Sequence, residues 1–556
     1  MSLALHLPFM KERHRKGKKQ ANPPVSSSTE GTPLARFYHY GDSSRGRLIL
    51  PALIAISTLL LGIWTFDPKL SLSGDNTEFI ILARSLAQGE GLVHINVPDP
   101  QPATKYPFGL PLLLAPLAWF FPGDWVPMKA WVLVIFALGM GILYQLVKER
   151  AGALPALATV VLSLTAGKSY LTHGPDGIVY GPLLLHYAHQ VMSEAPYLTF
   201  SLLALWLIER GVGREGVRDN WWLIAGFVCT MWAYYIRTVG IALVAAVLVY
   251  LLLRRDFRRG LMFAVAAFAC WLPWTLRNRA VGGGSIYINQ LFMVNPYHPD
   301  RGLLDFGGFV ERFFAHVQLY LTRELPNTLV PYFTGAETLL HPAVLLLVGL
   351  AVAVTALCIK RGENLLLLLY AGFFIGIVLL WPWPGDRFLM PVVPVLVFLS
   401  VWVVLWIHDK VAVHNAGAGR FLLWGIFLVF FFATLGGVKR LADYSEADYP
   451  PQWSRYYQAG QWLRTHAPED AIVLCRKGYW MSVVSGRRCI GFPFEEPPIV
   501  LEHMDREAVD YVVLESLGFP QTVQYLVPTV NAYRDRFEVQ WQDQALPTYV
   551  LRFLNE

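Results

Sequence analysis

Five charged residues stand in or beside apolar segments of the chain, where their types could support chemistry. Glu194, Arg237 and Arg387 lie at the ends of apolar runs, and Asp75 and Lys105 lie in the loop after the first run. A charge inside a bilayer costs at least about 2.5 kcal/mol, so a functional role is the first hypothesis for such a residue. A carboxylate can act as a base or bind a metal, and cations beside it can hold a phosphate. The set therefore suits transfer of a group from a phospholipid-linked donor.

Structural roles compete with this interpretation. Asp75 stands directly before a helix-like segment and could cap it. Glu78, three residues later, completes a pattern like a capping box, and capping is the favoured role for it. Glu194 and Arg237 could instead join two helices as an ion pair or extend to the headgroups, although we favour function for both. For Arg387 the alternatives are balanced because Asp386 is adjacent.

Other polar residues give weaker signals. Glu78, Tyr106 and His298 are kept as candidate supporting residues. The histidines of two loops show no spacing that repeats a known ligand pattern, so metal binding by any one of them is the weaker hypothesis; these are His173, His186, His189, His298 and His316. A divalent metal at the carboxylates stays an open alternative, and no other cofactor is predicted.

The composition indicates that a membrane positions these residues. The chain has 556 residues, of which 54% are hydrophobic and 15% charged, with a mean hydropathy of +0.41. A soluble chain of this size needs roughly 25% charged residues, so lipid-facing surface must replace the missing charge. Five cysteines are too few for a disulfide-stapled scaffold.

Apolar runs of about 17–21 residues, long enough to cross about 30 Å of hydrocarbon, recur along the chain. We expect 11–13 crossings in total. Two runs carry one ionisable group near an end, and the short segment 107–121 is interrupted by three prolines, so either it does not span or a further crossing lies within 151–190. The uninterrupted runs are 48–66, 130–147, 151–167, 238–253, 260–276, 341–359, 365–384, 388–407 and 421–438, and the two that carry a charge are 191–208 and 221–237.

Lys and Arg in short loops predict the orientation, because such loops stay in the cytoplasm. Residues 1–46 are expected to form a disordered, basic cytoplasmic tail, followed by a transmembrane domain over 47–440. Clusters near 210–218, 254–259, 360–361 and 410–420 mark cytoplasmic turns. The loops 67–106, 168–190 and 278–340 and the part from 441 to 556 are then extracytoplasmic. The loop 278–340 is a candidate for acceptor gating.

The C-terminal part has the pattern of a small soluble α/β domain. Helices are predicted over 453–465 and 522–533, and strands over 471–475, 511–514, 537–541 and 549–553. Cys475 and Cys489 could pair in an oxidising compartment, but two unpaired buried thiols are the favoured interpretation.

At these positions the sequence resembles a known family. The first loop begins Gly74-Asp75-x-x-Glu78-Phe79, ends its helix with Ala87-x-Gly89-x-Gly91-Leu92, and continues as Tyr106-Pro107-x-Gly109-Leu110-Pro111. Together with segments 192–196, 237–240 and 386–391, this order is similar to the GT-C glycosyltransferases, in the branch that holds the protein O-mannosyltransferases and the lipid A aminoarabinose transferase. The resemblance covers about 70–440 and rests on the order of the motifs.

The resemblance implies a role for each residue. Asp75 would be the general base or would orient the acceptor, Lys105 would hold the donor phosphate, Glu194 is the acidic residue that opens a later span, and Arg387 would face the donor phosphate. The sequence departs at Asn76, where relatives often have a second acid, and this leaves metal use and the identity of the base open.

The resemblance also implies the fold class and the reaction. The fold would be a polytopic α-helical GT-C-like membrane protein with a C-terminal α/β domain, in a bacterial inner membrane. An acceptor hydroxyl on a lipid, glycan or protein would attack a polyprenyl-phosphate sugar with inversion. The alternative is a secondary transporter or flippase, which would place charges near the midplane and show internal repeats; neither is evident in the sequence. Nucleic acid is not expected as a partner.

Overall fold

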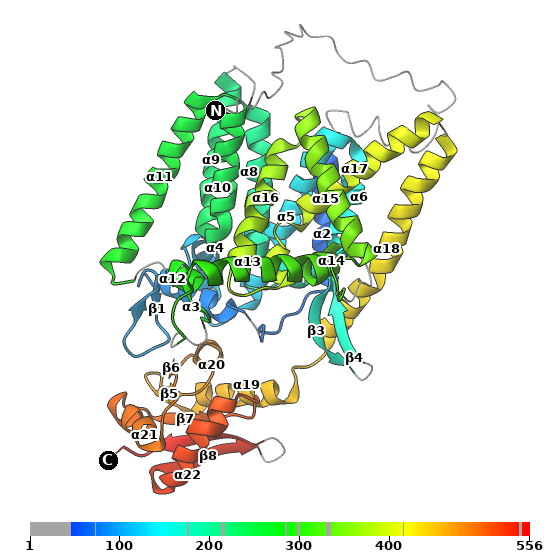
Figure 1. Ribbon diagram of the computed structural model, residues 1–556. Helices are drawn as coiled ribbons and strands as arrows, with labels where there is room; N and C mark the ends of the chain where they lie inside the picture. Colours follow the sequence, from blue (N-terminus) through cyan, green and yellow to red (C-terminus); the bar gives the residue numbers. More distant parts are fainter. Residues whose placement is uncertain are drawn as a thin grey trace.

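The computed structural model describes residues 46–72, 74–174, 177–212, 217–283, 286–296, 301–329, 335–414, 416–543 and 547–555. His298 and the predicted N-terminal tail as far as residue 45 lie outside these ranges. Figure 1 shows a bundle of long helices, a smaller α/β domain below it, and connecting segments gathered between the two.

The bundle consists of helices that are mostly apolar. Five of those described are long and apolar enough to cross a membrane, namely α2, α5, α11, α15 and α17, with shorter apolar helices beside them. The predicted polytopic α-helical fold is therefore confirmed. The bounds are α2 (Gly46–Trp64), α4 (Gly109–Phe120), α5 (Val126–Ala151), α6 (Ala153–Thr165), α8 (Glu194–Gly211), α9 (Val217–Ile236), α10 (Ile241–Leu253), α11 (Phe257–Ala280), α15 (Pro342–Arg361), α16 (Leu365–Leu380), α17 (Val393–His414) and α18 (Ala416–Glu446).

The uncertain segment 107–121 contains only a short helix. Helix α4 has 12 residues, which gives a length of about 18 Å at 1.5 Å per residue. That is shorter than the roughly 30 Å of hydrocarbon that a span must cross. Segment 151–190 contains the short helix α6 and then a hairpin, β3 (Ser169–Gly174) with β4 (Gly177–Gly181), before α7 (Leu183–Ala188). Sequence reasoning missed this hairpin.

Close packing of α5 against α8 fixes where α8 begins. A Cβ added to Gly139 would lie 2.3 Å from the hydroxyl oxygen of Thr199, so only glycine permits this approach. The same Thr199 hydroxyl donates to the carbonyl of Ile135 at 2.9 Å. These contacts hold the first turns of α8, which begins at Glu194, against α5.

The loops at the lower end of the bundle carry short elements. The first holds α3 (Asn76–Ala87), β1 (Val93–His94) and β2 (Gln101–Pro102). The later loops hold η1 (Thr238–Gly240), α12 (Ile286–Phe292), α13 (Phe306–Leu319), η3 (Tyr320–Glu324), α14 (Leu325–Leu329) and η4 (Asp386–Leu389). Figure 1 shows α13 lying across the ends of the membrane helices.

The sequence from Ile80 to Gly89 predicts an amphipathic helix that lies on the membrane surface, but α3 is buried in the protein instead. Its residues 76–83 and 85 are buried. The polar residues that suggested a solvent-exposed face of this helix have hydrogen-bond partners inside the protein. Arg84 donates to the carbonyl of Val483 at 3.4 Å, and Ser85 donates to the carbonyl of Gly91 at 2.7 Å. The C-terminal domain therefore covers this helix.

The C-terminal domain is built around a five-stranded sheet in the order β6-β5-β7-β9-β8. The predicted strands appear as β5 (Ile472–Leu474), β7 (Tyr511–Leu514), β8 (Phe537–Asp543) and β9 (Thr548–Phe553), and the predicted helices as α19 (Pro451–His466) and η5 with α22 (Thr522–Leu526 and Val527–Ala532). Sequence reasoning missed α20 (Gly478–Ser485), β6 (Arg488–Ile490) and α21 (Pro497–Arg506). A turn, η6 (Arg534–Arg536), precedes β8. Cys475 and Cys489 are buried and unpaired.

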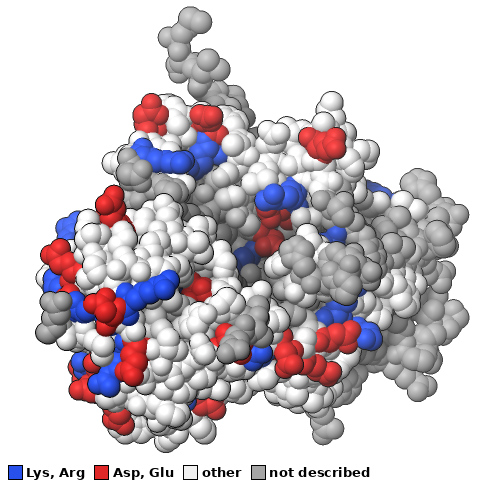
Figure 2. Space-filling view, turned by 90° about the horizontal axis from the view of Figure 1, so that it is seen from below, with Lys and Arg blue, Asp and Glu red and all other residues white. Residues whose placement is uncertain are grey.

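Direct contacts fix this domain against the first loop. The indole NH of Trp480 donates to the carbonyl of Ser71 at 2.8 Å, and the backbone NH of Cys489 donates to that of Asn96 at 2.6 Å. Helix α20 packs on α3. Figure 2, seen from the side of this domain, shows a hollow beside it in which acidic and basic side chains are visible.

Candidate active site

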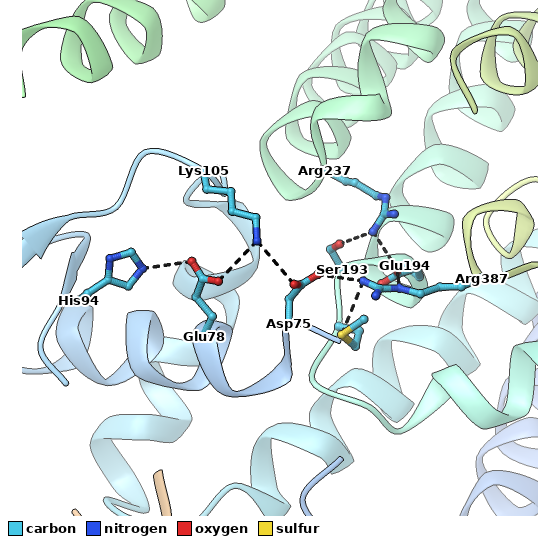
Figure 3. Close-up of polar contacts among 9 residues, drawn as sticks. Asp75, Glu78, His94, Lys105, Ser193, Glu194, Arg237 and Arg387 are labelled. Carbon is cyan, nitrogen blue, oxygen red and sulfur yellow. Dashed lines mark hydrogen bonds and ion pairs between the residues drawn. The ribbon is translucent and has the colours of Figure 1, made fainter. Parts of the chain in front are cut away.

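The structure brings together all five charged residues singled out in the sequence (Figure 3). Each comes from a different element at the same end of the bundle. Asp75 stands at the start of α3, Lys105 precedes α4, Glu194 opens α8, Arg237 follows α9, and Arg387 lies in η4.

Arg387 is the centre of the cluster because it bridges both carboxylates. Its Nε lies 2.6 Å from Oε1 of Glu194, and its Nη2 lies 3.0 Å from Oδ2 of Asp75. Charge-assisted contacts of this length are the strong ones. The expected local pair with Asp386 is replaced by these longer-range pairs: the carboxylate of Asp386 accepts from the backbone NH of Arg387 instead.

Arg237 supports the buried end of the cluster. Its Nη1 lies 2.9 Å from Oε1 of Glu194 and 2.8 Å from the hydroxyl of Ser193. The Glu194 side chain is fully buried, so the same carboxylate oxygen receives both arginines. Its other oxygen, Oε2, has no hydrogen-bond partner among the described residues. One acceptor site thus stays free in a buried, strongly positive surrounding.

Lys105 lies at the open side of the cluster. Its Nζ is 3.7 Å from Oδ1 of Asp75 and 3.7 Å from Oε2 of Glu78, and it stands over the Tyr106 ring at 4.3 Å. With 30% of its side chain exposed, it is the most accessible cation of the set. The 3.7 Å separations are longer than ion-paired hydrogen bonds, so Lys105 can turn toward an incoming anion.

The capping interpretations are wrong. Asp75 occupies the position before α3, but its side chain makes no cap hydrogen bond and contacts Arg387 and Lys105 instead. Glu78 does not reach back to the helix start either, because Oε1 lies 3.1 Å from Nε2 of His94. The local sequence favoured capping, but both carboxylates instead contact cationic side chains that are distant in the sequence.

The glycine before Asp75 permits this arrangement. Gly74 has φ +75°, a left-handed conformation that side chains rarely adopt. A Cβ there would lie 2.8 Å from Cε of Met192 and 3.2 Å from Nη1 of Arg387. Gly74 thus turns the chain into α3 and lets Arg387 come close to Asp75.

The charges of the cluster balance and shift the pKa of its members. Asp75, Glu78 and Glu194 are matched by Lys105, Arg237 and Arg387. Burial raises the pKa of Asp75, but the opposing effect of Arg387 and Lys105 is larger, so the pKa lies below its ordinary value of 3.8. Burial lowers the pKa of Arg387, but Glu194 and Asp75 raise it above its ordinary value. Both groups are therefore charged at neutral pH.

Comparisons with solved structures identify the fold that positions this cluster. No model of a known protein family matches the sequence, and a search of curated proteins finds none that is similar. The structure is similar to ArnT from Cupriavidus metallidurans in the apo state, with a TM-score of 0.57 and 13% sequence identity over 92% of this chain and 98% of that one. The same enzyme bound to undecaprenyl phosphate gives a TM-score of 0.56, again with 13% identity and the same coverage. The chain has the GT-C fold of ArnT.

In this GT-C fold several residues near the cluster escaped sequence reasoning. Ser193 and His94 contact Arg237 and Glu78, and Phe388 lies beside both arginines, 5.9 Å from Arg237 and 5.8 Å from Arg387. Tyr287, from α12, is packed 6.2 Å from the Tyr106 ring. Ser193 and Phe388 were adjacent to chosen residues and could have been found by that signal, whereas nothing in the sequence distinguishes His94 or Tyr287.

Of the supporting candidates, Tyr106 and Glu78 reach the cluster. The Tyr106 ring lies below Nζ of Lys105, and burial and the Asp75 carboxylate raise the pKa of Tyr106. His186 and His189 are in another part of the GT-C domain, beside Tyr444 and Phe66. His316 contacts the carbonyl of Leu379 instead of the cluster.

The carboxylates of the cluster do not fit a divalent metal. Both oxygens of Asp75 face cations, Arg387 at 3.0 Å and Lys105 at 3.7 Å, and the engaged oxygen of Glu194 faces two arginines. No group of three or more His, Cys, Asp or Glu side chains in the described ranges is arranged to hold a metal. No step below is routed through one.

Proposed function

We propose that this protein is a membrane glycosyltransferase that moves a sugar from a polyprenyl-phosphate carrier to an acceptor hydroxyl, with inversion. The acceptor is a lipid, a glycan or a protein. The cluster and the C-terminal domain would face the extracytoplasmic side of a bacterial inner membrane, with the N-terminus in the cytoplasm. The GT-C fold supports the proposal, as does the similarity to an ArnT structure described as bound to undecaprenyl phosphate.

The observation that carries the proposal is the bridge made by Arg387 between Asp75 and Glu194. A guanidinium held between two carboxylates is oriented and charged before any substrate arrives, which is the preorganisation that stabilises a developing phosphate charge. Arg237 contacts the same oxygen of Glu194, and Lys105 lies beside Asp75 (Figure 3). Three cations around one point suit the phosphate of a lipid-linked sugar.

The proposed step uses these residues as follows. Lys105, Arg237 and Arg387 hold the donor phosphate, while Asp75 accepts the proton of the acceptor hydroxyl. The hydroxyl oxygen bonds to the anomeric carbon from the face opposite the phosphate. The bond between that carbon and the phosphate oxygen breaks, its electron pair stays on the oxygen, and polyprenyl phosphate leaves. Glu194 keeps both arginines in place throughout.

Donor binding also makes Asp75 a better base. With Lys105 and Arg387 directed at it, the carboxyl has a lowered pKa and a weak tendency to take a proton. A bound phosphate draws both cations toward itself, which removes part of the cause of the lowered pKa. The base would therefore reach its useful strength only when the donor is in place.

The test is to incubate the purified protein with a panel of polyprenyl-phosphate sugars and acceptors and to measure release of free polyprenyl phosphate. The proposal expects release with at least one donor, and loss of release in Asp75→Ala. If no donor is consumed, with or without added divalent cations, the protein is not a transferase of this kind. Movement of an intact labelled lipid across vesicle membranes would then support the flippase alternative.

A further inference from the structure

A second cluster of cations lies in the C-terminal domain and plays no part in the proposed step. Arg476 and Lys477 follow β5 after one residue, Cys475. Arg476 stands 5.3 Å from the ring of Phe494 and 5.1 Å from that of Phe519. Lys477 stands 4.5 Å from the Phe519 ring. Phe519 is thus shared between two neighbouring cations.

The cluster sits where the sheet topology places ligands. β5 pairs in parallel with β6 on one side and β7 on the other, although the chain visits them in the order β5, β6, β7. The connections therefore leave β5 and β7 in opposite directions, and in open α/β sheets ligands bind outside the carboxyl ends of the strands at such a point. Arg476 and Lys477 come from the end of β5, Phe519 from the end of β7, and Phe494 from the end of β6.

Neither cation is in direct contact with an anionic side chain of the described residues. Within the described residues neither side chain has an ion pair or a side-chain hydrogen bond, and Nε of Arg476 is buried without a partner. Glu515, whose negative charge acts on Lys477, makes its hydrogen bonds elsewhere, with the hydroxyl of Thr522 and the backbone NH of Leu517. Burial and the charge of Arg476 lower the pKa of Lys477. Two partly buried like charges side by side are unfavourable unless an anion joins them.

The aromatic rings indicate what kind of anion fits. Phe494 is 48% exposed although it is a large apolar side chain, and it stands beside Arg476. An aromatic face next to a cation matches a sugar ring, whose C–H groups pack on the ring while an attached phosphate or carboxylate meets the cation.

The cluster is connected to the first loop of the membrane domain. Lys477 stands 5.0 Å from the ring of Trp480, whose NH donates to Ser71, four residues before Asp75. Tyr479, between them, lies 5.8 Å from the ring of His94, the partner of Glu78. Figure 1 shows β5 and α20 on the side of the domain that faces α3.

We propose that Arg476, Lys477, Phe494 and Phe519 form a binding subsite for an anionic saccharide, the acidic sugar of the acceptor. The part of this inference that makes the sugar an acceptor rests on the proposed function. The binding of an anionic sugar at this subsite does not depend on it. The subsite would hold a phosphorylated or carboxylated sugar on the C-terminal domain and present a neighbouring hydroxyl to the cluster around Asp75.

Saturation-transfer NMR on the full-length protein tests the binding directly, with glucose 1-phosphate, glucose and inorganic phosphate as probes. Glucose 1-phosphate should give a signal, and glucose a much weaker one. The double variant Arg476→Gln/Lys477→Gln should weaken binding at least about tenfold, and Phe519→Leu should weaken it too. The matched control is Arg488→Gln, an exposed arginine on β6 outside the cluster, which should bind like the wild type.

The possible results separate this inference from the proposed function. The subsite is overturned if the wild type does not bind glucose 1-phosphate. It is also overturned if the double variant, with the thermal stability of the wild type, binds it equally well. Inorganic phosphate that competes as well as the sugar phosphate overturns its saccharide part. In the transfer assay the double variant should raise the KM for the acceptor, whereas a raised KM for the donor alone would assign the cluster to the donor and contradict the inference. Sugar-phosphate binding without any transfer would support the subsite and count against the transferase.

Discussion

Arg387 contacts Glu194 and Asp75 through two different nitrogens, Nε at 2.6 Å and Nη2 at 3.0 Å, although the two carboxylates are 119 residues apart in the chain. A planar guanidinium can direct its donors along two lines at once, whereas an ammonium group cannot. The position of Asp75 relative to the arginines therefore depends on the shape of this side chain as well as on its charge.

Arg387→Lys should consequently lose most activity while keeping the charge. We expect the rate of carrier release to fall about 100-fold or more, as when one preorganised donor is removed from an oxyanion site. The measurement is release of polyprenyl phosphate at saturating donor. Arg488→Gln serves as the control, and a lysine variant with wild-type turnover would show that charge alone suffices.

Glu194 and Asp75 should respond differently to neutralisation. Glu194 is fully buried with two arginines on one oxygen, so Glu194→Gln removes the carboxylate that pairs with Arg237 and leaves Arg387 with Asp75 alone. Removing one partner of a buried pair costs about 3–5 kcal/mol, and thermal unfolding in detergent should show a clear loss. Asp75→Asn, at 29% side-chain exposure, should unfold near the wild-type temperature but lose turnover. Equal losses of stability in the two variants would contradict this division of roles.

Lys105 should control the pH dependence through Asp75. The lowered pKa of Asp75 means that its carboxylate is ionised at neutral pH and that its stabilising ion pairs are lost only as pH falls through that lowered value. Lys105→Met removes one cause of the lowering, so the acid limb of kcat/KM should move to higher pH. A pH profile of the two proteins measures the shift, and an acid limb that stays in place or moves to lower pH would argue against Asp75 as the base.

The sequence pointed to Glu194, Arg237 and Arg387 because each stands at the end of an apolar run, and to Asp75 and Lys105 because they lie in the long first loop. The structure gathers all five because the elements that carry them meet at one end of the bundle. The sequence could not predict their pairing. Capping of α3 by Asp75 is a local rule, and it was outcompeted by Arg387, which is distant in sequence. For the same reason His94 escaped notice, since only the folded loop brings it to Glu78. In the C-terminal domain β5 and β6 have three residues each, but β5 lies in the apolar run 471–475, whereas β6 begins at Arg488, directly after Arg487, and shows no apolar run.

Gly74 offers a test of how tightly the cluster is fixed. Gly74→Ala would strain a left-handed backbone and push a methyl group against Met192 and Arg387. Gly89 has a similar φ of +81°, but nothing lies within 4 Å of its Cβ position, so Gly89→Ala isolates the backbone strain, which is about 1 kcal/mol. Both variants should unfold at slightly lower temperature, and only Gly74→Ala should lose carrier release, because only there does the added methyl displace Arg387 from Asp75. A Gly74→Ala protein as active as Gly89→Ala would mean that the contact between Arg387 and Asp75 tolerates displacement, and the bridge would then not be the feature on which transfer depends.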